Sequence, residues 1–216
     1  MPLVDLSHVV ETGMTTYPGL PAPIVCDYLT REASRSRYTD GTTFHIGKIE
    51  MVRNTGTYVD APFHRFEGRA DLADLPLERL ADLEARVVSV DPERRAIGPE
   101  AFAHLDLRDK ALLVHTGRSR HFRTPAYFEG HPFLTRAAAA ALVEARAAFV
   151  AIDSLNIDDI ADGARPAHTL LLGAGIPIGE HFTNLAALPS SGARLHSVPV
   201  KVRAMGTFPV RAYAVV

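Results

Sequence analysis

The chain has 216 residues, of which 47% are hydrophobic and 22% charged, a composition typical of a globular protein with one sizeable core. Its 23 Lys and Arg nearly balance 25 Asp and Glu, which argues against a nucleic-acid partner. No apolar stretch reaches the ~20 residues of a membrane span, and no basic and apolar leader opens the chain, so we expect a cytoplasmic protein without a membrane partner.

Strands are predicted along the whole chain, wherever short runs rich in β-branched and apolar residues occur. In chain order these runs are 24–26, 44–52, 86–90, 111–115, 148–152, 169–172, 197–204 and 210–216. Because the run 44–52 alternates only partly between polar and apolar residues, we expect it to be buried on both faces.

Helices are predicted in three places. The clearest covers 135–147, where Thr135 is a suitable N-cap before an Ala-rich run. A second is expected within 75–83 and a short one at 99–105, where Pro99 suits a first turn. Since the first helix connects two predicted strands, those strands should be parallel neighbours. The chain is therefore expected to be a single α/β domain over 1–216, strand-rich with a few helices.

Cysteine and histidine usage limits the chemistry of a site. The single cysteine, Cys26, excludes an internal disulfide framework and a cysteine-based zinc cluster, and we expect it in the core. There are ten histidines, and imidazole is the commonest transition-metal ligand. The chain contains no Gly-rich phosphate loop, nucleophile elbow or H-E-x-x-H helix. A site built from histidine and carboxylate side chains is therefore predicted.

The loop 54–64 holds the first candidate residues. Asp60 and His64 flank Pro62, whose ring stiffens the backbone and fixes how the two side chains are presented. Taken alone, this segment fits a turn capped by Asp60 as well as a metal site. His168 and Glu180 stand at the edges of two later apolar runs. With Asp60 they would supply a nitrogen and oxygen ligand set suited to Zn²⁺ or Mn²⁺.

Several motifs occur in an order that resembles one known family. They are Asp5-Leu6-Ser7-His8, Gly13-Met14, Tyr17-Pro18-Gly19, Gly56-Thr57, Asp60, Pro62, His64, His168-Thr169-Leu170-Leu171, Ile176-Pro177-Ile178-Gly179-Glu180, Asn184-Leu185 and Pro209-Val210-Arg211-Ala212. Across nearly its whole length the chain is similar to the cyclase family of metal-dependent hydrolases, which includes bacterial kynurenine formamidases and isatin hydrolases. The resemblance implies a β/β/α fold and a homodimer or homotetramer.

The resemblance also implies roles for individual residues. Asp60, His168 and Glu180 correspond to metal ligands, and His64 corresponds to the general base. Two histidines that hold a second ion in the family's dinuclear members are replaced by Asn54 and Tyr58. Neutral amide and phenol groups are poor ligands, so we expect one divalent ion per chain, Zn²⁺ or Mn²⁺.

Three possibilities follow from the two replacements. A single ion could be held by Asp60, His168 and Glu180, with His64 as a further ligand; the metal could be lost, leaving a small-molecule binding protein; or His45 or His181 could act as a new ligand. Asn54 and Tyr58 are expected to bind substrate, and Tyr58 to donate to an oxyanion. The predicted activity is hydrolysis of a small amide, lactam or lactone by a metal-activated water, with His64 as the base.

Overall fold

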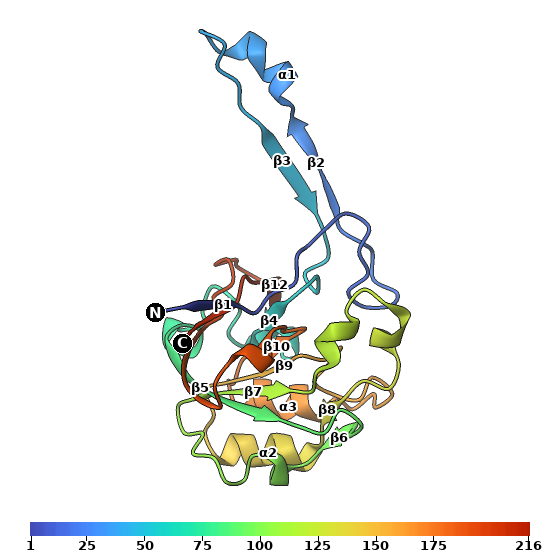
Figure 1. The fold of residues 1–216 in the computed structure, drawn as a ribbon, viewed down its shortest axis with the longest axis vertical. Coiled ribbons are helices and arrows are strands. Elements are labelled where there is room, and N and C mark those ends of the chain that lie inside the picture. The colour runs from blue at the N-terminus through green and yellow to red at the C-terminus, as the bar shows by residue number, and fades with distance from the viewer.

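A nine-stranded mixed sheet runs through the centre of the molecule, in the order β1-β13-β11-β5-β7-β9-β10-β4-β12 (Figure 1). The computed structural model describes residues 1–216. Its strands are β1 (Leu3–Asp5), β2 (Ile24–Leu29), β3 (Ile46–Glu50), β4 (Tyr58–Asp60), β5 (Leu83–Ser89), β6 (Ala96–Ile97), β7 (Ala111–His115), β8 (Phe133–Leu134), β9 (Phe149–Ile152), β10 (Ile178–Glu180), β11 (Ser191–His196), β12 (Thr207–Pro209) and β13 (Tyr213–Val215). The α-helices are α1 (Arg31–Ser34), α2 (Arg136–Glu144) and α3 (Pro166–Gly173). The expected strand-rich α/β fold is confirmed.

The parallel centre of the sheet is confirmed as well. Strand β7 pairs in parallel with β9, and α2 lies between them in the chain. The hydroxyl of Thr135 accepts a hydrogen bond from the backbone N–H of Ala138, which caps the helix as predicted. The helix ends at Glu144, three residues before the predicted end. None of the helices is both long and apolar enough to cross a membrane.

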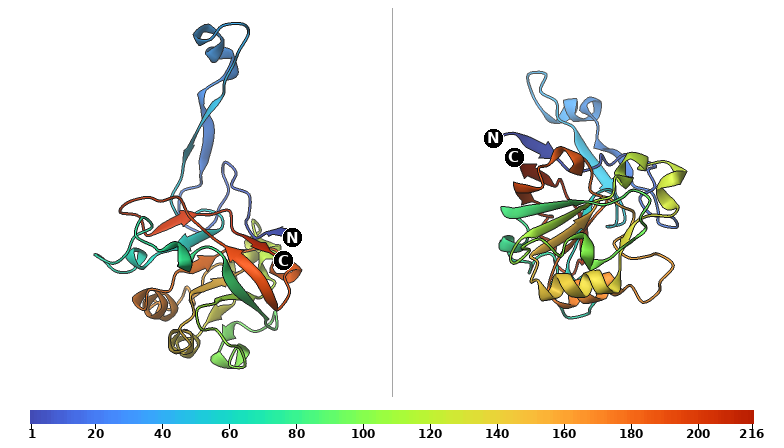
Figure 2. Two further views of the ribbon diagram at one scale, coloured as in Figure 1. Left: turned by 90° about the vertical axis from the view of Figure 1, so that its left-hand side faces the viewer. Right: turned by 60° about the horizontal axis from the view of Figure 1, so that its bottom comes forward.

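Apolar side chains pack on both faces of this sheet. On one face, Leu112 and Val150 pack with α2 and α3, and on the other Leu113 and Phe149 form a second core cluster with side chains of the outer strands. Figure 2 shows α2 and α3 below the curved sheet. Strands buried on both faces tolerate little movement, so they give a rigid support for the loops at their ends.

Strand β4 lies between β10 and β12, and its register places four polar residues together. Asp60 is directly opposite Thr207 on β12, and Tyr58 is directly opposite Glu180 on β10. Side chains two residues apart on a strand point to the same face. The four side chains therefore share one face of the sheet, which sequence patterns alone did not indicate.

The run 169–172 was predicted as a strand, and this is wrong, because it lies in α3. Short apolar runs fit a buried strand and a buried helix equally well. The helix forms because Pro166 occupies its first turn and the Asp158 carboxylate accepts hydrogen bonds from the backbone N–H groups of Ala167 and His168. This capping carboxylate is separated from the helix in the chain, so a local pattern cannot reveal it.

Four further predicted segments need correction. Residues 197–204 form no strand, and within them Pro199 has no N–H to donate to a ladder. The helix expected within 75–83 is reduced to a single 3-10 turn at Leu77–Arg79, and the one at 99–105 to a turn at Pro99–Ala101. The run 210–216 begins as loop, and only Tyr213–Val215 is a strand.

The largest departure from expectation is a projecting hairpin. Strands β2 and β3 pair with each other alone and extend away from the rest of the molecule, with α1 near their tip (Figure 1). Every residue of β3 is exposed, so the expectation that 44–52 is buried on both faces is wrong. Cys26, expected in the core, is also exposed on this hairpin.

Candidate metal centre

A pocket of about 340 Å³ opens beside β4, β10 and the first turn of α3. Its lining consists of Tyr17, Leu20, Asn54, Tyr58, His64, Arg65, Asn156, Arg165, His168 and Glu180. Most of these side chains are polar, and five of them were singled out as site residues by the sequence. The elements that carry them come from distant parts of the chain, so only the fold brings them together.

Three predicted ligands meet at the floor of this pocket. His168 Nε2 lies 3.7 Å from Asp60 Oδ2 and 3.7 Å from Glu180 Oε1. All three side chains are buried, with Asp60 fully inaccessible. Donor atoms around one tetrahedral zinc ion, at bonds of about 2.0–2.1 Å, would lie roughly 3.3 Å apart. Each carboxylate oxygen therefore lies near enough to His168 Nε2 to share an ion with it after small adjustments, whereas the three residues whose ligand atoms all lie within 4.8 Å of one another are Asp60, His64 and His168, without Glu180.

A carboxylate on the loop before α3 orients His168. The Nδ1 atom of His168 lies 2.7 Å from Asp158 Oδ2. This contact directs Nε2 of His168 toward Asp60 and Glu180. Burial disfavours the charged imidazolium, but the hydrogen bond with Asp158 and the carboxylates of Asp60 and Glu180 outweigh it and raise the pKa of His168 to about 10. A histidine held by a carboxylate on its outer side is the usual arrangement of a metal-bound imidazole.

Asp60 has one oxygen engaged and one free. Thr207 Oγ1 donates to Oδ1, while Oδ2 is buried with no hydrogen-bond partner. Burial alone would raise the pKa of Asp60, but His64, His168 and the Thr207 hydroxyl outweigh it and lower the pKa. A buried, ionised oxygen without a partner is costly in an apolar interior. A cation next to Oδ2 would remove that cost, so the donor set fits a divalent metal ion.

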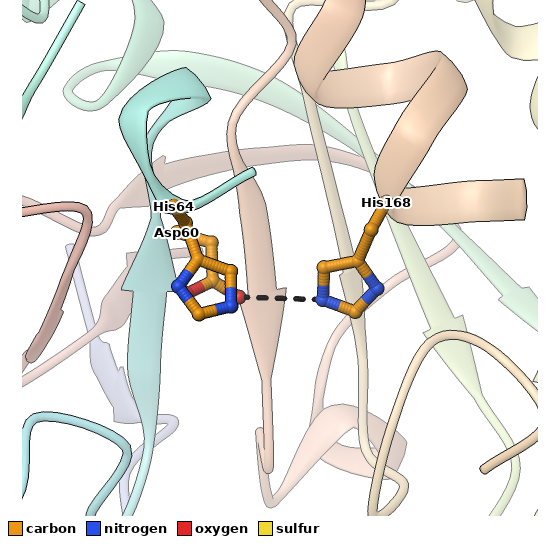
Figure 3. Close-up of side chains that lie close together, drawn as sticks. All are labelled: Asp60, His64 and His168. Carbon is orange, nitrogen blue, oxygen red and sulfur yellow. Dashed lines mark ion pairs between the residues drawn. The ribbon is translucent and has the colours of Figure 1, made fainter. Parts of the chain in front are cut away.

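The His64 side chain lies close to Asp60 and opposite His168 (Figure 3). In Figure 3 the rings of His64 and His168 lie opposite each other, with the Asp60 carboxylate behind the His64 ring in this view, and the dashed line joins Asp60 to His168. One ligand atom each from Asp60, His64 and His168 lies within 4.8 Å of the others. His64 is about one-third exposed, unlike the other two, so solvent or a substrate can reach its ring.

Gly206 allows His64 to occupy this position. A Cβ atom added at Gly206 would lie 2.4 Å from the backbone nitrogen of His64 and 2.5 Å from its Cα. Both atoms belong to the backbone, which cannot rotate away as a flexible side chain can. The 3-10 turn Pro62–His64 therefore packs against β12 only because residue 206 has no side chain.

Both oxygens of Glu180 are hydrogen-bonded. The Tyr58 hydroxyl donates to Oε2 at 2.6 Å, and the backbone N–H of Ile157 donates to Oε1 at 2.6 Å. Burial raises the pKa of Glu180 to about 7, against the opposing effect of His168. Burial also raises the pKa of Tyr58, which keeps its hydroxyl protonated and able to donate. Tyr58 thus contacts a predicted ligand directly.

The remaining candidates differ in where they lie. Asn54 lines the pocket, and that it binds substrate stays a prediction. His181 is fully buried outside the pocket lining, where its Nδ1 pairs with the Tyr127 hydroxyl at 2.8 Å and burial lowers its pKa to about 3. His45 precedes β3 on the projecting hairpin and pairs there with Asp27. The structure therefore does not bring His45 to the three predicted ligands.

Sequence reasoning missed four residues around the pocket. Asp158 orients His168, Thr207 bridges Asp60 and His64, and Asn156 and Arg165 line the pocket. Arg165 adopts a left-handed backbone conformation (φ 45°) just before α3, which is unusual for a residue with a side chain. Asp158 and Asn156 follow a predicted strand, which was the one available signal. Nothing local marked Thr207.

The comparisons with known proteins point to one family. Residues 4–159 match the model of the family described as "Putative cyclase". The kynurenine formamidase of Salinibacter ruber is 27% identical over 213 residues, covering 98% of this chain and 96% of that protein. The kynurenine formamidase of Geobacillus thermodenitrificans is also 27% identical, with coverage of 95% and 99%.

Solved structures share the fold. Isatin hydrolase A from Labrenzia aggregata, bound to benzyl benzoate, superimposes with a TM-score of 0.83 at 22% identity, covering 99% of this chain and 93% of that one. A structure described as a potential metal-dependent hydrolase with cyclase activity gives a TM-score of 0.80 at 24% identity, with coverage of 99% and 96%. Because the family model covers well over half of the chain, this protein belongs to the cyclase family.

Proposed function

We propose that this protein is a metal-dependent hydrolase of the cyclase type that acts on a small amide, lactam or lactone. The observation that carries the proposal is the buried Asp60 Oδ2, which has no hydrogen-bond partner and lies 3.7 Å from Nε2 of His168, a residue that lines a polar pocket. The names of the relatives, kynurenine formamidase and isatin hydrolase, support hydrolysis of amide bonds.

Asp60, His168 and Glu180 would hold one divalent ion per chain, and we propose Zn²⁺ or Mn²⁺. Such an ion polarises a carbonyl oxygen and makes a water molecule more acidic. The residues around the ligands support this assignment, since Asp158 restrains His168 and the Tyr58 hydroxyl restrains Glu180. Carboxylate and imidazole donors suit both metals.

The hydrogen bonds around Thr207 support His64 as the general base. The ionised carboxylate of Asp60 can only accept, so the Thr207 hydroxyl donates its proton to Asp60. The oxygen of Thr207 then accepts from His64, 2.8 Å away, which requires that Nδ1 of His64 carries a proton. Nε2 of the neutral ring is left unprotonated. His64 can therefore take a proton from the attacking water at Nε2 and return it to the leaving group.

Tyr58 has a different proposed role from the one expected from the sequence. Its hydroxyl is engaged with Glu180, so we propose that it positions this ligand, while Asn54 lines the pocket and contacts substrate. Replacing Tyr58 with phenylalanine removes the donor and leaves Glu180 Oε2 without this hydrogen bond.

For Tyr58→Phe we expect metal affinity to fall by about 10–100-fold, the usual effect of removing a group that orients a ligand. Competition with a fluorescent chelator measures the Kd. Tyr213→Phe on the outer strand β13 is the matched control and should bind metal as the wild type does. An unchanged Kd for Tyr58→Phe would show that the hydroxyl does not position Glu180.

A binding protein without metal remains the second candidate. What favours it is the expectation from the family resemblance that Asn54 and Tyr58 stand where related dinuclear sites have histidine. Assays of the wild-type protein with formyl-amides, lactams and lactones, with each metal added back, separate the two candidates. Turnover that disappears with a chelator and returns with metal supports the hydrolase. Tight binding of a small molecule without turnover supports the binding protein.

A further inference from the structure

The loop between β9 and α3 contributes three consecutive residues to the candidate site. Asn156 lines the pocket, and the backbone N–H of Ile157 donates to Glu180 Oε1. The Asp158 carboxylate contacts Nδ1 of His168. All three loop residues are buried, although most loops run over the surface of a protein. Ile157 and Asp158 each hold a proposed ligand, whereas Asn156 is hydrogen-bonded to neither ligand.

The orientation of the Asn156 amide follows from its partner. Its side chain accepts a hydrogen bond from the backbone N–H of Asp158 at 2.9 Å. Because a backbone N–H can only donate, the accepting atom is the oxygen Oδ1, and the other atom is the nitrogen Nδ2. Nδ2 has no acceptor within the protein. Asn156 is 8% exposed and lines the pocket, so its free N–H groups are available to a molecule bound there.

Asn156 differs from the other buried residues of the pocket lining. Four of the ten lining residues are buried, and they are Tyr58, Asn156, His168 and Glu180. The Tyr58 hydroxyl donates to Glu180, and His168 and Glu180 are the proposed ligands. Asn156 therefore holds the free donor of this buried group. A buried amide donor without an acceptor is costly, which favours an acceptor on the bound molecule.

Hydrolysis of an amide or ester develops such an acceptor. When the oxygen of water bonds to the carbonyl carbon, an electron pair of the C=O bond moves onto the carbonyl oxygen, which becomes negatively charged. In the proposed reaction, His64 takes one proton from the water and gives it to the leaving nitrogen or oxygen as the C=O bond re-forms and the bond to the leaving group breaks. A fixed N–H donor stabilises the oxyanion more than the neutral carbonyl oxygen, and this difference lowers the barrier.

We propose that Asn156 is a catalytic residue whose Nδ2 donates a hydrogen bond to this oxyanion. The proposal rests on the proposed function, since it requires a hydrolytic reaction in the pocket. The buried loop suits the role, because the Asp158 N–H holds Oδ1 and Nδ2 need not reorient as the charge develops. Tyr58, the oxyanion donor expected from the sequence, is engaged with Glu180, and Asn156 takes that role instead.

Two substitutions separate the donor from the conformation of the loop. Asn156→Asp keeps an acceptor for the Asp158 N–H but removes the donor, and Asn156→Ala removes both without adding charge. We use saturating metal and whichever formyl-amide, lactam or lactone the wild type hydrolyses fastest. Both variants should lose about 10²–10³ in kcat at a nearly unchanged KM. Asn184→Asp is the matched control, because Asn184 is exposed outside this pocket, and it should keep wild-type kinetics.

The kinetic outcomes distinguish this proposal from the proposed function. No turnover by the wild type would contradict the hydrolase itself. Wild-type turnover with full kcat in Asn156→Ala would overturn only the role of Asn156. A raised KM at wild-type kcat would also overturn it, since that pattern marks binding of the ground state. Loss of kcat in Asn156→Asp alone would show that the added charge, and not the missing donor, slows the reaction.

Binding of methylphosphonate tests the donor without turnover. Its tetrahedral anionic centre has the shape and charge of the oxyanion intermediate. In isothermal titration of the metal-loaded protein, Asn156→Ala should bind it about 10–100-fold more weakly than the wild type, the usual effect of losing one hydrogen bond to a charged group. Asn184→Asp should bind it as the wild type does. Equal Kd values for Asn156→Ala and the wild type, or no binding by the wild type, would contradict the donor role.

Discussion

Replacing Asp60 with asparagine should remove most of the metal affinity and nearly all turnover. The asparagine side chain lacks the negative charge of the Asp60 carboxylate, whose Oδ2 is buried without a hydrogen-bond partner. It also alters the group that accepts the hydrogen bond from the Thr207 hydroxyl. We expect the loss of affinity to exceed the 10–100-fold typical of changes outside the ligand shell. Isothermal titration with Zn²⁺ or Mn²⁺ measures it.

The same variant should also lose its thermal response to metal. A ligand that binds only the folded state at 100 times its Kd stabilises it by about 2.7 kcal/mol, which for a chain of this size raises Tm by roughly 5–10 °C. Asp153→Asn is the control, because Asp153 is equally buried but bonds to Thr116 and Gly117, outside the pocket. It should lower the starting Tm yet keep the metal-dependent rise. A full rise in Asp60→Asn would place the ion elsewhere.

Replacing His64 with alanine should lower kcat by about 10²–10⁴ while the metal stays bound. The reason is the proposed role of His64 as base through Nε2, the ring nitrogen that the Thr207 contact leaves free. His104→Ala, at an exposed position, should keep wild-type turnover. The metal content of both variants, measured by elemental analysis, distinguishes a general base from a metal ligand at His64. If His64→Ala loses its metal, His64 is a ligand and the base lies elsewhere.

Thr207 provides a second test of the same hydrogen bonds. Thr207→Val keeps the shape of the side chain but removes the hydroxyl that links Asp60 and His64. We expect a fall in kcat without a matching change in KM, because Thr207 positions the base and does not contact substrate. Thr207→Ser should restore kcat. A serine variant as slow as the valine one would show that the hydroxyl has no positioning role.

The sequence predicted the central part of the fold because its signals are local. The cap at Thr135 and the apolar strands on either side of the helix lie within short windows, and the parallel crossover follows from them. Asp60, His168 and Glu180 were chosen as candidate ligands through ordered motifs. Their convergence is a property of the fold, since β4, α3 and β10 are brought together only by the sheet.

The wrong and missing predictions had physical causes as well. The run 169–172 was misread because the Asp158 carboxylate that caps α3 comes from outside the helix. The strand at 44–52 was expected inside the protein because its apolar residues suit a core, whereas they lie on the projecting hairpin. Thr207 was missed because its importance depends on its register opposite Asp60, which no local pattern encodes.

The most direct test of the metal site is the metal content of the wild-type protein. Purified without added metal and then incubated with Zn²⁺ or Mn²⁺, it should hold one ion per chain by elemental analysis, because one set of carboxylate and imidazole donors surrounds His168. Two ions per chain would show that other side chains supply the metal ligands that Asn54 and Tyr58 do not supply. No retained ion would contradict the metal-dependent hydrolase and favour the binding protein.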